Sequence, residues 1–333
     1  MTETTNTRDR LRLIVSEQPR ADTDLPDIED IRLGTYDGPS VIEQGDVLDI
    51  DLPTGSVALI VTSPPSVDEH AESNDISRSA AWGSYRQFLA DSFAEMWRVL
   101  EPGGRLAFVV NPAASSPFLP VCAHATSALQ IAGFQLRGEV VWAKSDMPLP
   151  LDGGVLRGPH NPPIVGVTER ILLASKMTDH RRNSQTERRS IGMPCENSIT
   201  AKQWAENRLD IWPIPAPPPG ELIHHDPFPI ELARRLIETH TYEGDLVCDP
   251  MCGTGTTPVA AQQSGRRYFA IDIDPEQVAL AQKRSNNLTT EYVTPDLEKT
   301  QKRHPAHMLM PGHTQLGFDF TPEPTPNRND PTQ

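Results

Sequence analysis

The fold class of this chain is decided by residues 247–257, which read Val-Cys-Asp-Pro-Met-Cys-Gly-Thr-Gly-Thr-Thr. An apolar run ends in an acidic residue, Asp249, and is followed by a glycine-containing turn and the start of a helix. In a doubly wound α/β sheet, ligands bind at the carboxyl ends of strands, where glycine lets the backbone approach and helix N–H groups face the ligand. The stretch therefore predicts an α/β fold with a ligand site at this turn.

Two kinds of phosphate site are excluded by the same stretch. The three-glycine spacing of dinucleotide-binding turns is absent, and so is the Gly-Lys-Ser/Thr of a phosphate-binding loop. Asp249 instead offers a carboxylate that suits a ligand with an ammonium or hydroxyl group.

A second acidic strand end occurs at residues 267–276, Arg-Tyr-Phe-Ala-Ile-Asp-Ile-Asp-Pro-Glu. Asp272 ends an apolar run there, where a carboxylate can accept hydrogen bonds from ribose hydroxyls. The alternative is that Asp272 or Asp274 caps the helix that follows. Together with the glycine turn, the pattern favours an adenosine-type ligand.

A third signal lies far upstream, in residues 57–66, Val-Ala-Leu-Ile-Val-Thr-Ser-Pro-Pro-Ser. A strand-like run is followed by Ser63, Pro64 and Pro65, and prolines have a fixed φ angle and no N–H. They predict a rigid ledge whose Ser63 hydroxyl and main-chain carbonyls can accept both hydrogens of an exocyclic amino group. Taken alone, Ser-Pro-Pro is also typical of an ordinary turn at the end of a strand.

The order of these motifs resembles that of the amino-methylating DNA methyltransferases. It is most similar to the permuted group, in which the catalytic half precedes the half that binds S-adenosylmethionine. The resemblance covers residues 41–175 and 222–288, and residues 97–104 and 228–237 add to it. It implies a Rossmann-like methyltransferase fold, which is a doubly wound, mostly parallel sheet.

The resemblance also implies which residues contact the cofactor. Asp46 matches the position that contacts the adenine, with a turn-forming aspartate as the alternative. Thr256 and Thr257 either donate to the cofactor carboxylate or simply start a helix. Cys252 is expected to be buried and not reactive. The predicted cofactor contacts are Asp46, Asp249, Pro250, Cys252, Gly253, Gly255, Thr256, Thr257 and Asp272.

Ser63, Pro64 and Pro65 are the predicted catalytic residues. Family members that carry Ser at the first of these positions resemble the cytosine-N4 enzymes, whereas Asp or Asn is usual in enzymes that act on adenine. The resemblance therefore favours direct in-line transfer to the N4 amino group of a flipped cytosine in duplex DNA, with adenine-N6 methylation as the alternative. RNA and protein amides remain further candidate substrates.

Ser66 is a departure from the family pattern, which usually has an aromatic residue directly after the two prolines to stack on the extruded base. Trp82 and Tyr85 are the nearest rings that can substitute, and simple packing is the alternative role for Trp82. Ser66, Trp82 and Tyr85 are the predicted contacts with the substrate base. If neither ring substitutes, the chain is a catalytically weakened, methyltransferase-like protein that binds DNA.

The formal net charge of −15 is unusual for a protein that binds nucleic acid, because phosphate contacts require clustered Lys and Arg. Residues 176–189 are the basic exception. We therefore predict that Arg181, Arg182, Arg188 and Arg189 face the DNA, with an ordinary solvated loop as the alternative.

The 333 residues are predicted to form one large α/β domain with additions. We expect a mobile acidic arm at 1–38, a methyltransferase domain at 39–302 and a disordered, Pro-rich tail at 303–333. The domain divides into a catalytic half (39–175), a target-recognition insertion (176–221) and a cofactor-binding half (222–302). Strands are predicted at 57–61, 106–110, 139–142, 171–174, 246–248 and 268–271, and helices at 85–100, 119–132, 229–240, 256–264 and 275–286.

Composition limits the remaining classes. No apolar run approaches the ~20 residues that a membrane-spanning helix needs, and the four cysteines form no Cys-x-x-Cys pair. We expect a cytoplasmic protein with reduced thiols and no metal. The resemblance implies duplex DNA as the partner, allows for a cognate restriction endonuclease, and leaves monomer and homodimer open.

Overall fold

The computed structural model describes residues 36–74, 77–111, 118–144, 166–178, 180–181, 184–217 and 227–287. The predicted tail at 303–333, and nearly all of the predicted arm at 1–38, lie outside these described residues.

Eight strands form one sheet in the order β1-β8-β7-β2-β3-β5-β4-β6. Within the described strands, β5 runs antiparallel to both of its neighbours and every other neighbouring pair is parallel. This arrangement confirms the predicted mostly parallel, doubly wound sheet. The strands are β1 (Val41–Gln44), β2 (Val57–Thr62), β3 (Leu100–Val110), β4 (Phe134–Ala143), β5 (Thr168–Lys176), β6 (Ile211–Pro213), β7 (Leu246–Asp249) and β8 (Arg267–Asp272).

The central feature of the sheet is the pairing of β2 with β7. Leu59 lies opposite Val247 and Ile60 lies opposite Cys248, in parallel. From β2 the sheet continues to β3 on one side, and from β7 it continues to β8 on the other. The strand order therefore reverses between β2 and β7, which is the position where doubly wound sheets bind ligands.

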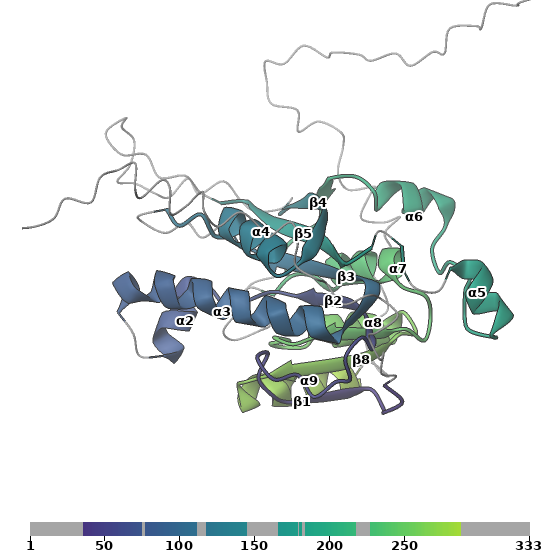
Figure 1. The fold of residues 1–333 in the computed structure, drawn as a ribbon, viewed down its shortest axis with the longest axis horizontal. Coiled ribbons are helices and arrows are strands. Elements are labelled where there is room, and N and C mark those ends of the chain that lie inside the picture. Colours follow the sequence, from purple (N-terminus) through teal and green to yellow (C-terminus); the bar gives the residue numbers. More distant parts are fainter. Residues whose placement is uncertain are drawn as a thin grey trace, which may run out of the picture. The chain divides into compact units, whose positions relative to one another are not determined.

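Helices cover both faces of the sheet (Figure 1). The strand side chains alternate, so Ile60 packs with α3 (Arg78–Val99) and α4 (Val121–Ile131), whereas Leu59 packs with α7 (Ile230–His240) and α8 (Thr256–Gln263). A further helix, α9 (Pro275–Asn287), contacts β1, β8 and α8. Among the described residues, no helix is long and apolar enough to cross a membrane.

Short elements that the sequence did not predict fill the remaining segments. They are β1, β6, α2 (Val67–Ser73), α5 (Gln185–Ser190) and α6 (Ala201–Glu206), and α3 also begins earlier than predicted. Each of the three short helices starts with a capping box, in which a Ser or Thr side chain and a Glu or Gln three residues later satisfy the first main-chain N–H groups. Local caps therefore support helices that are too short to show an apolar period.

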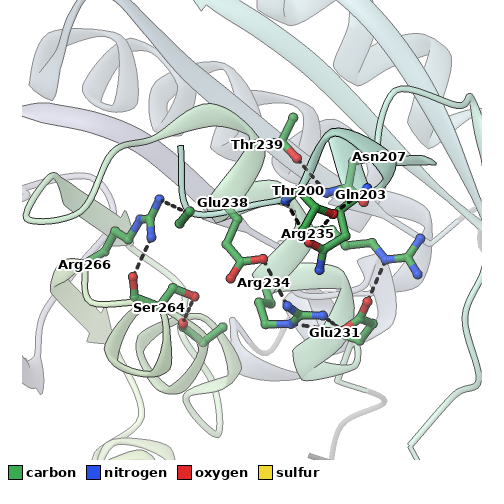
Figure 2. A network of polar contacts seen from close by, with 12 residues as sticks. Thr200, Gln203, Asn207, Glu231, Arg234, Arg235, Glu238, Thr239, Ser264 and Arg266 are labelled. Carbon is green, nitrogen blue, oxygen red and sulfur yellow. Dashed lines mark hydrogen bonds and ion pairs between the residues drawn. The ribbon is translucent and has the colours of Figure 1, made fainter. Parts of the chain in front are cut away.

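A polar network fixes the second part of the 176–221 segment to α7 and to Arg266, directly before β8 (Figure 2). Asn207 Nδ2, at the end of α6, donates to Thr239 Oγ1 at 3.0 Å, and Arg266 donates to Ser198 Oγ at 2.8 Å. On α7 itself, Arg234 pairs with Glu231 at 2.6 Å. These contacts hold residues 198–207 against the α7 side of the sheet.

Candidate functional site

The ledge and the glycine turn leave the sheet next to each other. The register between β2 and β7, continued by one residue, sets Val61 opposite Asp249. The Thr257 hydroxyl, in the first turn of α8, donates to the Val61 carbonyl at 3.1 Å. Ser63 therefore follows a strand that is hydrogen-bonded to the first turn of α8, which directly follows the turn at residues 250–255.

Glycine has two different roles in this turn. Gly253 has φ +50°, and a Cβ built on it would meet no atom within 4 Å. Gly255 has φ +83°, and its Cβ would lie 2.7 Å from the Cβ of Ala281. Gly255 is therefore required for the close packing of α8 on α9, whereas Gly253 borders open space that a ligand can occupy.

The Asp272 carboxylate lies beside this open space. Its Oδ2 accepts the Gly253 N–H at 2.7 Å, and its Oδ1 accepts the Asp274 N–H at 3.0 Å. Asp274, in turn, accepts the Glu276 N–H at 2.8 Å and so caps α9. Because Asp274 does the capping, the remaining lone pairs of Asp272 are available to ribose hydroxyls, and the site fits the nucleoside of S-adenosylmethionine.

Asp46 lies at the same edge of the sheet. Gln44, the last residue of β1, is opposite Asp272, and the Gly45 N–H donates to the Asp272 carbonyl at 3.0 Å. Asp46 is exposed, and its Oδ1 accepts the Leu48 N–H at 2.9 Å. The turn-forming role is therefore present, and it leaves the second carboxylate oxygen of Asp46 open to a ligand.

Asp249 is the buried acid of the site, with 3% of its surface exposed. The pKa of its carboxyl is raised to about 7, mainly by burial and further by the charge of Asp272. Thr257, Thr62 and the Met251 N–H lower this pKa, but by less. Although the Thr62 hydroxyl is near enough to affect this pKa, it makes no hydrogen bond of good geometry among the described residues. A cationic ligand group beside Asp249 would favour its ionised form.

The other predicted cofactor residues are mainly structural. Thr257 gives its proton to Val61, so its hydroxyl is not free to donate to a cofactor carboxylate, and Thr256 begins α8 as a buried residue. Pro250 is also buried. Burial raises the pKa of the Cys252 thiol, with Asp249 and Asp272 adding to the effect, and this supports the expectation of an inert cysteine.

An aromatic cluster packs against the ledge and is hydrogen-bonded to it. The Tyr85 hydroxyl donates to the Pro65 carbonyl at 2.9 Å, and the Tyr85 ring packs edge-on against His70. Among the described residues, no hydrogen bond engages the Ser63 hydroxyl. Ser63 Oγ and the Pro64 carbonyl therefore remain the predicted acceptors for the amino group.

Two of the predicted base contacts need correction. Tyr85 is only 2% exposed, and burial raises the pKa of its phenol, so its ring supports the ledge and cannot stack on a base. The Ser66 side chain caps α2 by accepting the Glu69 N–H at 3.1 Å. Trp82 is half-buried, stacked on Tyr85 and edge-on to His124, and stays a candidate for stacking.

The structure also corrects the expectation for two of the four arginines. Arg181 pairs with Asp245 at 2.6 Å and with Glu101 at 2.7 Å, while Arg188 is 2% exposed and pairs with Asp245 at 2.9 Å. Both guanidinium groups are thus held in ion pairs, Arg188 buried and Arg181 half-buried, and are unavailable to phosphates. Arg182 lies outside the described residues, and Arg189 is 63% exposed beside Glu196.

These ion pairs are at the wrong end of the sheet for base recognition. Asp245 directly precedes β7, whereas the candidate site follows the carboxyl ends of β2 and β7. Figure 1 shows α2, which follows the ledge, and α5 at opposite ends of the sheet. The first part of the 176–221 segment is therefore attached far from the ledge.

Sequence reasoning missed Gln277 on α9. Its side chain is 6% exposed, and its Oε1 is buried with no hydrogen-bond partner among the described residues. Gln277 shares the buried side of α9 with Val278 and Ala281. The available signal was a polar residue at a position where the helical period requires an apolar one.

Comparisons with known proteins extend over most of the chain. The sequence model of a protein family described as DNA methylase matches residues 57–283. The type II methyltransferase M.XycI of Xanthomonas campestris pv. cyanopsidis is 27% identical over 277 residues, which cover 73% of this chain and 86% of the relative.

Solved structures agree in fold. The protein TTHA0409 of Thermus thermophilus, described as a putative DNA modification methylase, matches with a TM-score of 0.58 and 27% identity over 75% of this chain and 95% of that chain. The same protein has been solved in complex with S-adenosyl-L-methionine, and that structure matches with a TM-score of 0.56. The PvuII DNA methyltransferase, described as cytosine-N4-specific, shares the fold with a TM-score of 0.55 at 18% identity, over 79% of this chain and 92% of that chain.

Proposed function

This chain belongs to the DNA methylase family of N6- and N4-methyltransferases and depends on S-adenosylmethionine; from this premise we propose that it methylates the N4 amino group of cytosine in duplex DNA. The pairing of β2 with β7 is the observation that carries the proposal. It supports the proposal because Ser63 follows β2 and the glycine turn follows β7; an amino group held by Ser63 would then face a methyl donor at the turn.

The bound cofactor supplies an electrophilic methyl group on a sulfonium. The ledge provides the complementary function, because an exocyclic amino nitrogen is a poor nucleophile while its lone pair is delocalised into the ring. Ser63 Oγ and the Pro64 carbonyl accept its two hydrogens and so turn the lone pair toward the methyl group. Holding the reacting atoms in line contributes roughly 7 to 11 kcal/mol in well-oriented systems.

Positive charge would move to the amino nitrogen as the N–C bond forms and the methyl–sulfur bond breaks, the sulfonium would leave as a neutral thioether, and the nitrogen would then lose one proton to solvent. Acceptors aimed at the amino hydrogens therefore bind the transition state more tightly than the ground state. The ledge is suited to this task because its prolines and the Tyr85 hydrogen bond restrict its movement. Duplex DNA hides the amino group, so the base is first swung out at a cost of a few kcal/mol.

The DNA is expected to approach the edge at which β2 and β7 end. Strands β3, β4 and β6 also end at this edge, because they run in the same direction as β2. Strand β3 is parallel to β2, β3 and β4 are both antiparallel to β5, and β6 is parallel to β4. Arg189 is a phosphate contact only for DNA that extends toward α5. The relatives named type II methyltransferases favour a companion restriction endonuclease, and we expect a monomer or homodimer in the cytoplasm.

Nucleoside analysis tests the choice of base. The full chain is incubated with tritiated S-adenosylmethionine and duplex DNA of mixed sequence, with RNA and protein substrates in parallel. Label in N4-methylcytosine supports the proposal. Label in N6-methyladenine instead assigns the adenine reaction, and label confined to RNA or protein overturns DNA as the substrate.

A second candidate function is a DNA-binding protein with weakened methyl transfer. It is favoured by the use of the Ser66 side chain as a helix cap and by the burial of Tyr85, which together leave Trp82 as the nearest ring. Cofactor binding without turnover on any DNA, restored by Ser66→Tyr, supports this candidate. Ser66→Ala is the control for the lost cap, which costs ~1 kcal/mol of stability.

A further inference from the structure

The buried amide of Gln277 has no role in the fold that the structure explains. Its Oε1 makes no hydrogen bond with any described residue although the side chain is only 6% exposed. Buried polar atoms in native proteins are nearly always paired with protein or ordered water, since an unpaired one destabilises the folded state. A group outside the described residues is therefore expected to complete this hydrogen bond.

Two neighbours on α9 show where Gln277 faces. Ala281 and Arg284 lie four and seven residues further along the helix, on the same side. Ala281 is the residue that Gly255 approaches, and Arg284 donates to the Thr254 carbonyl at 2.6 Å. This side of α9 therefore faces the glycine turn, and Gln277 is one helical turn closer to the sheet edge where β8 ends.

Gln277 is thus on the side of α9 that borders the cofactor space. Asp272 ends β8 five residues earlier, and its carboxylate holds the Gly253 N–H at 2.7 Å. The open space at Gly253 adjoins this carboxylate. A ribose has two neighbouring hydroxyl donors, while each Asp272 oxygen already accepts one main-chain N–H. A second acceptor beside Asp272 would complete the recognition of both hydroxyls.

We propose that Gln277 is a further cofactor-binding residue, whose Oε1 accepts a hydrogen bond from a ribose hydroxyl of S-adenosylmethionine. The inference deepens the proposed cofactor site and rests on the placement of the ribose at Asp272. It does not depend on which base is methylated. The Gln277 oxygen is then unpaired only in the cofactor-free protein, and cofactor binding supplies its hydrogen-bond donor.

Isothermal titration of the full chain with S-adenosylhomocysteine tests the proposal without turnover. Gln277→Leu is expected to weaken binding roughly fivefold to tenfold, the effect of losing one neutral hydrogen bond. The same substitution is expected to leave the melting temperature of the cofactor-free protein unchanged or higher, because it removes a buried oxygen that has no partner among the described residues.

Gln282→Leu is the matched control on the same helix. Gln282 Nε2 donates to the Ile42 carbonyl at 2.8 Å, so its loss is expected to lower the melting temperature and leave the affinity unchanged. Unchanged affinity in Gln277→Leu overturns the proposal, and so does an equal loss of affinity in both variants. Asp272→Asn distinguishes the role of Gln277 from the placement of the ribose. If Asp272→Asn weakens binding and Gln277→Leu does not, only the role of Gln277 is overturned. If neither variant weakens binding, the placement of the ribose at Asp272 is overturned as well.

Discussion

The Thr257 hydroxyl donates to the main-chain carbonyl of Val61 across a sequence separation of 196 residues, at a distance of 3.1 Å. Both groups are buried, so solvent does not compete for the bond. Thr257 belongs to the helix that follows the glycine turn, and Val61 lies two residues before Ser63. The bond therefore fixes the start of α8, directly after the glycine turn, relative to the strand that leads to Ser63.

Thr257→Val is expected to remove this link. The Val61 carbonyl would lose its side-chain donor in a buried position, which lowers the free energy of unfolding by about 1 to 3 kcal/mol. Turnover should fall as well, because the ledge and the turn are no longer held at a fixed separation. Urea denaturation and a tritium-transfer assay measure the two effects. Thr126→Val, which breaks only a hydrogen bond within α4, should leave turnover unchanged.

Ser63→Ala tests the acceptor directly. The variant keeps the prolines but lacks the hydroxyl, so kcat should fall about 10²-fold, the scale seen when one preorganised hydrogen-bond partner of a transition state is removed. Cofactor affinity should not change. Ser56→Ala is the control, since its hydroxyl bonds the Pro53 carbonyl in the preceding loop. A Ser63→Ala enzyme with wild-type kcat would exclude the ledge mechanism.

Asp249 makes stability depend on pH with a definite sign. Folding raises its pKa from 3.8 to about 7, so the folded state favours the protonated carboxyl. The resulting cost is absent below about pH 4, grows up to about pH 7 and stays constant above it. Asp249→Asn should therefore gain about 2 to 3 kcal/mol over wild type between pH 5 and pH 8, since one pKa unit corresponds to about 1.4 kcal/mol.

Urea denaturation of cofactor-free protein at the two pH values measures this gain. Asp249→Asn should also bind S-adenosylmethionine more weakly, while wild-type affinity rises with pH through about 7, as the carboxylate becomes available to a cationic group. An Asn variant whose stability advantage does not change with pH would contradict the buried acid.

Asp245→Ala tests the ion-pair cluster that replaces the predicted DNA contacts. Removing the shared carboxylate leaves Arg188 buried without this ion pair and Arg181 with Glu101 alone, which should lower the free energy of unfolding by about 3 to 5 kcal/mol. At a temperature where the variant is folded, its kcat should match wild type, because the cluster is remote from the ledge. Glu196→Ala breaks an exposed pair with Arg189 and should cost less than about 1 kcal/mol.

The sequence predicted the elements that carry strong periodic patterns. The six predicted strands and five predicted helices are all present, and the two motif-bearing strands β2 and β7 are paired. Their patterns are informative because burial on both faces selects continuous apolar runs such as residues 57–61. The family resemblance supplied the order of the two halves.

Contacts between polar residues that are distant in the chain could not be predicted from the sequence. Nothing near Arg188 indicates that its partner is Asp245, 57 positions later, so the charge run at 176–189 has the same pattern as a nucleic-acid surface. Ser66 is a different case, because Ser-Val-Asp-Glu at 66–69 matches the sequence signature of a capping box. The cap could therefore have been predicted from the sequence, and the structure shows it.

The insertion of β7 between β8 and β2 has a consequence for biosynthesis. A ribosome completes β5 at Lys176, 70 positions before β7 begins at Leu246, so the nascent chain carries an open strand edge along β2 until β7 is made. Exposed edges of this kind pair readily with other chains. We expect a truncated product that stops at residue 217 to aggregate, and the full-length chain to need chaperone protection until its last strands emerge.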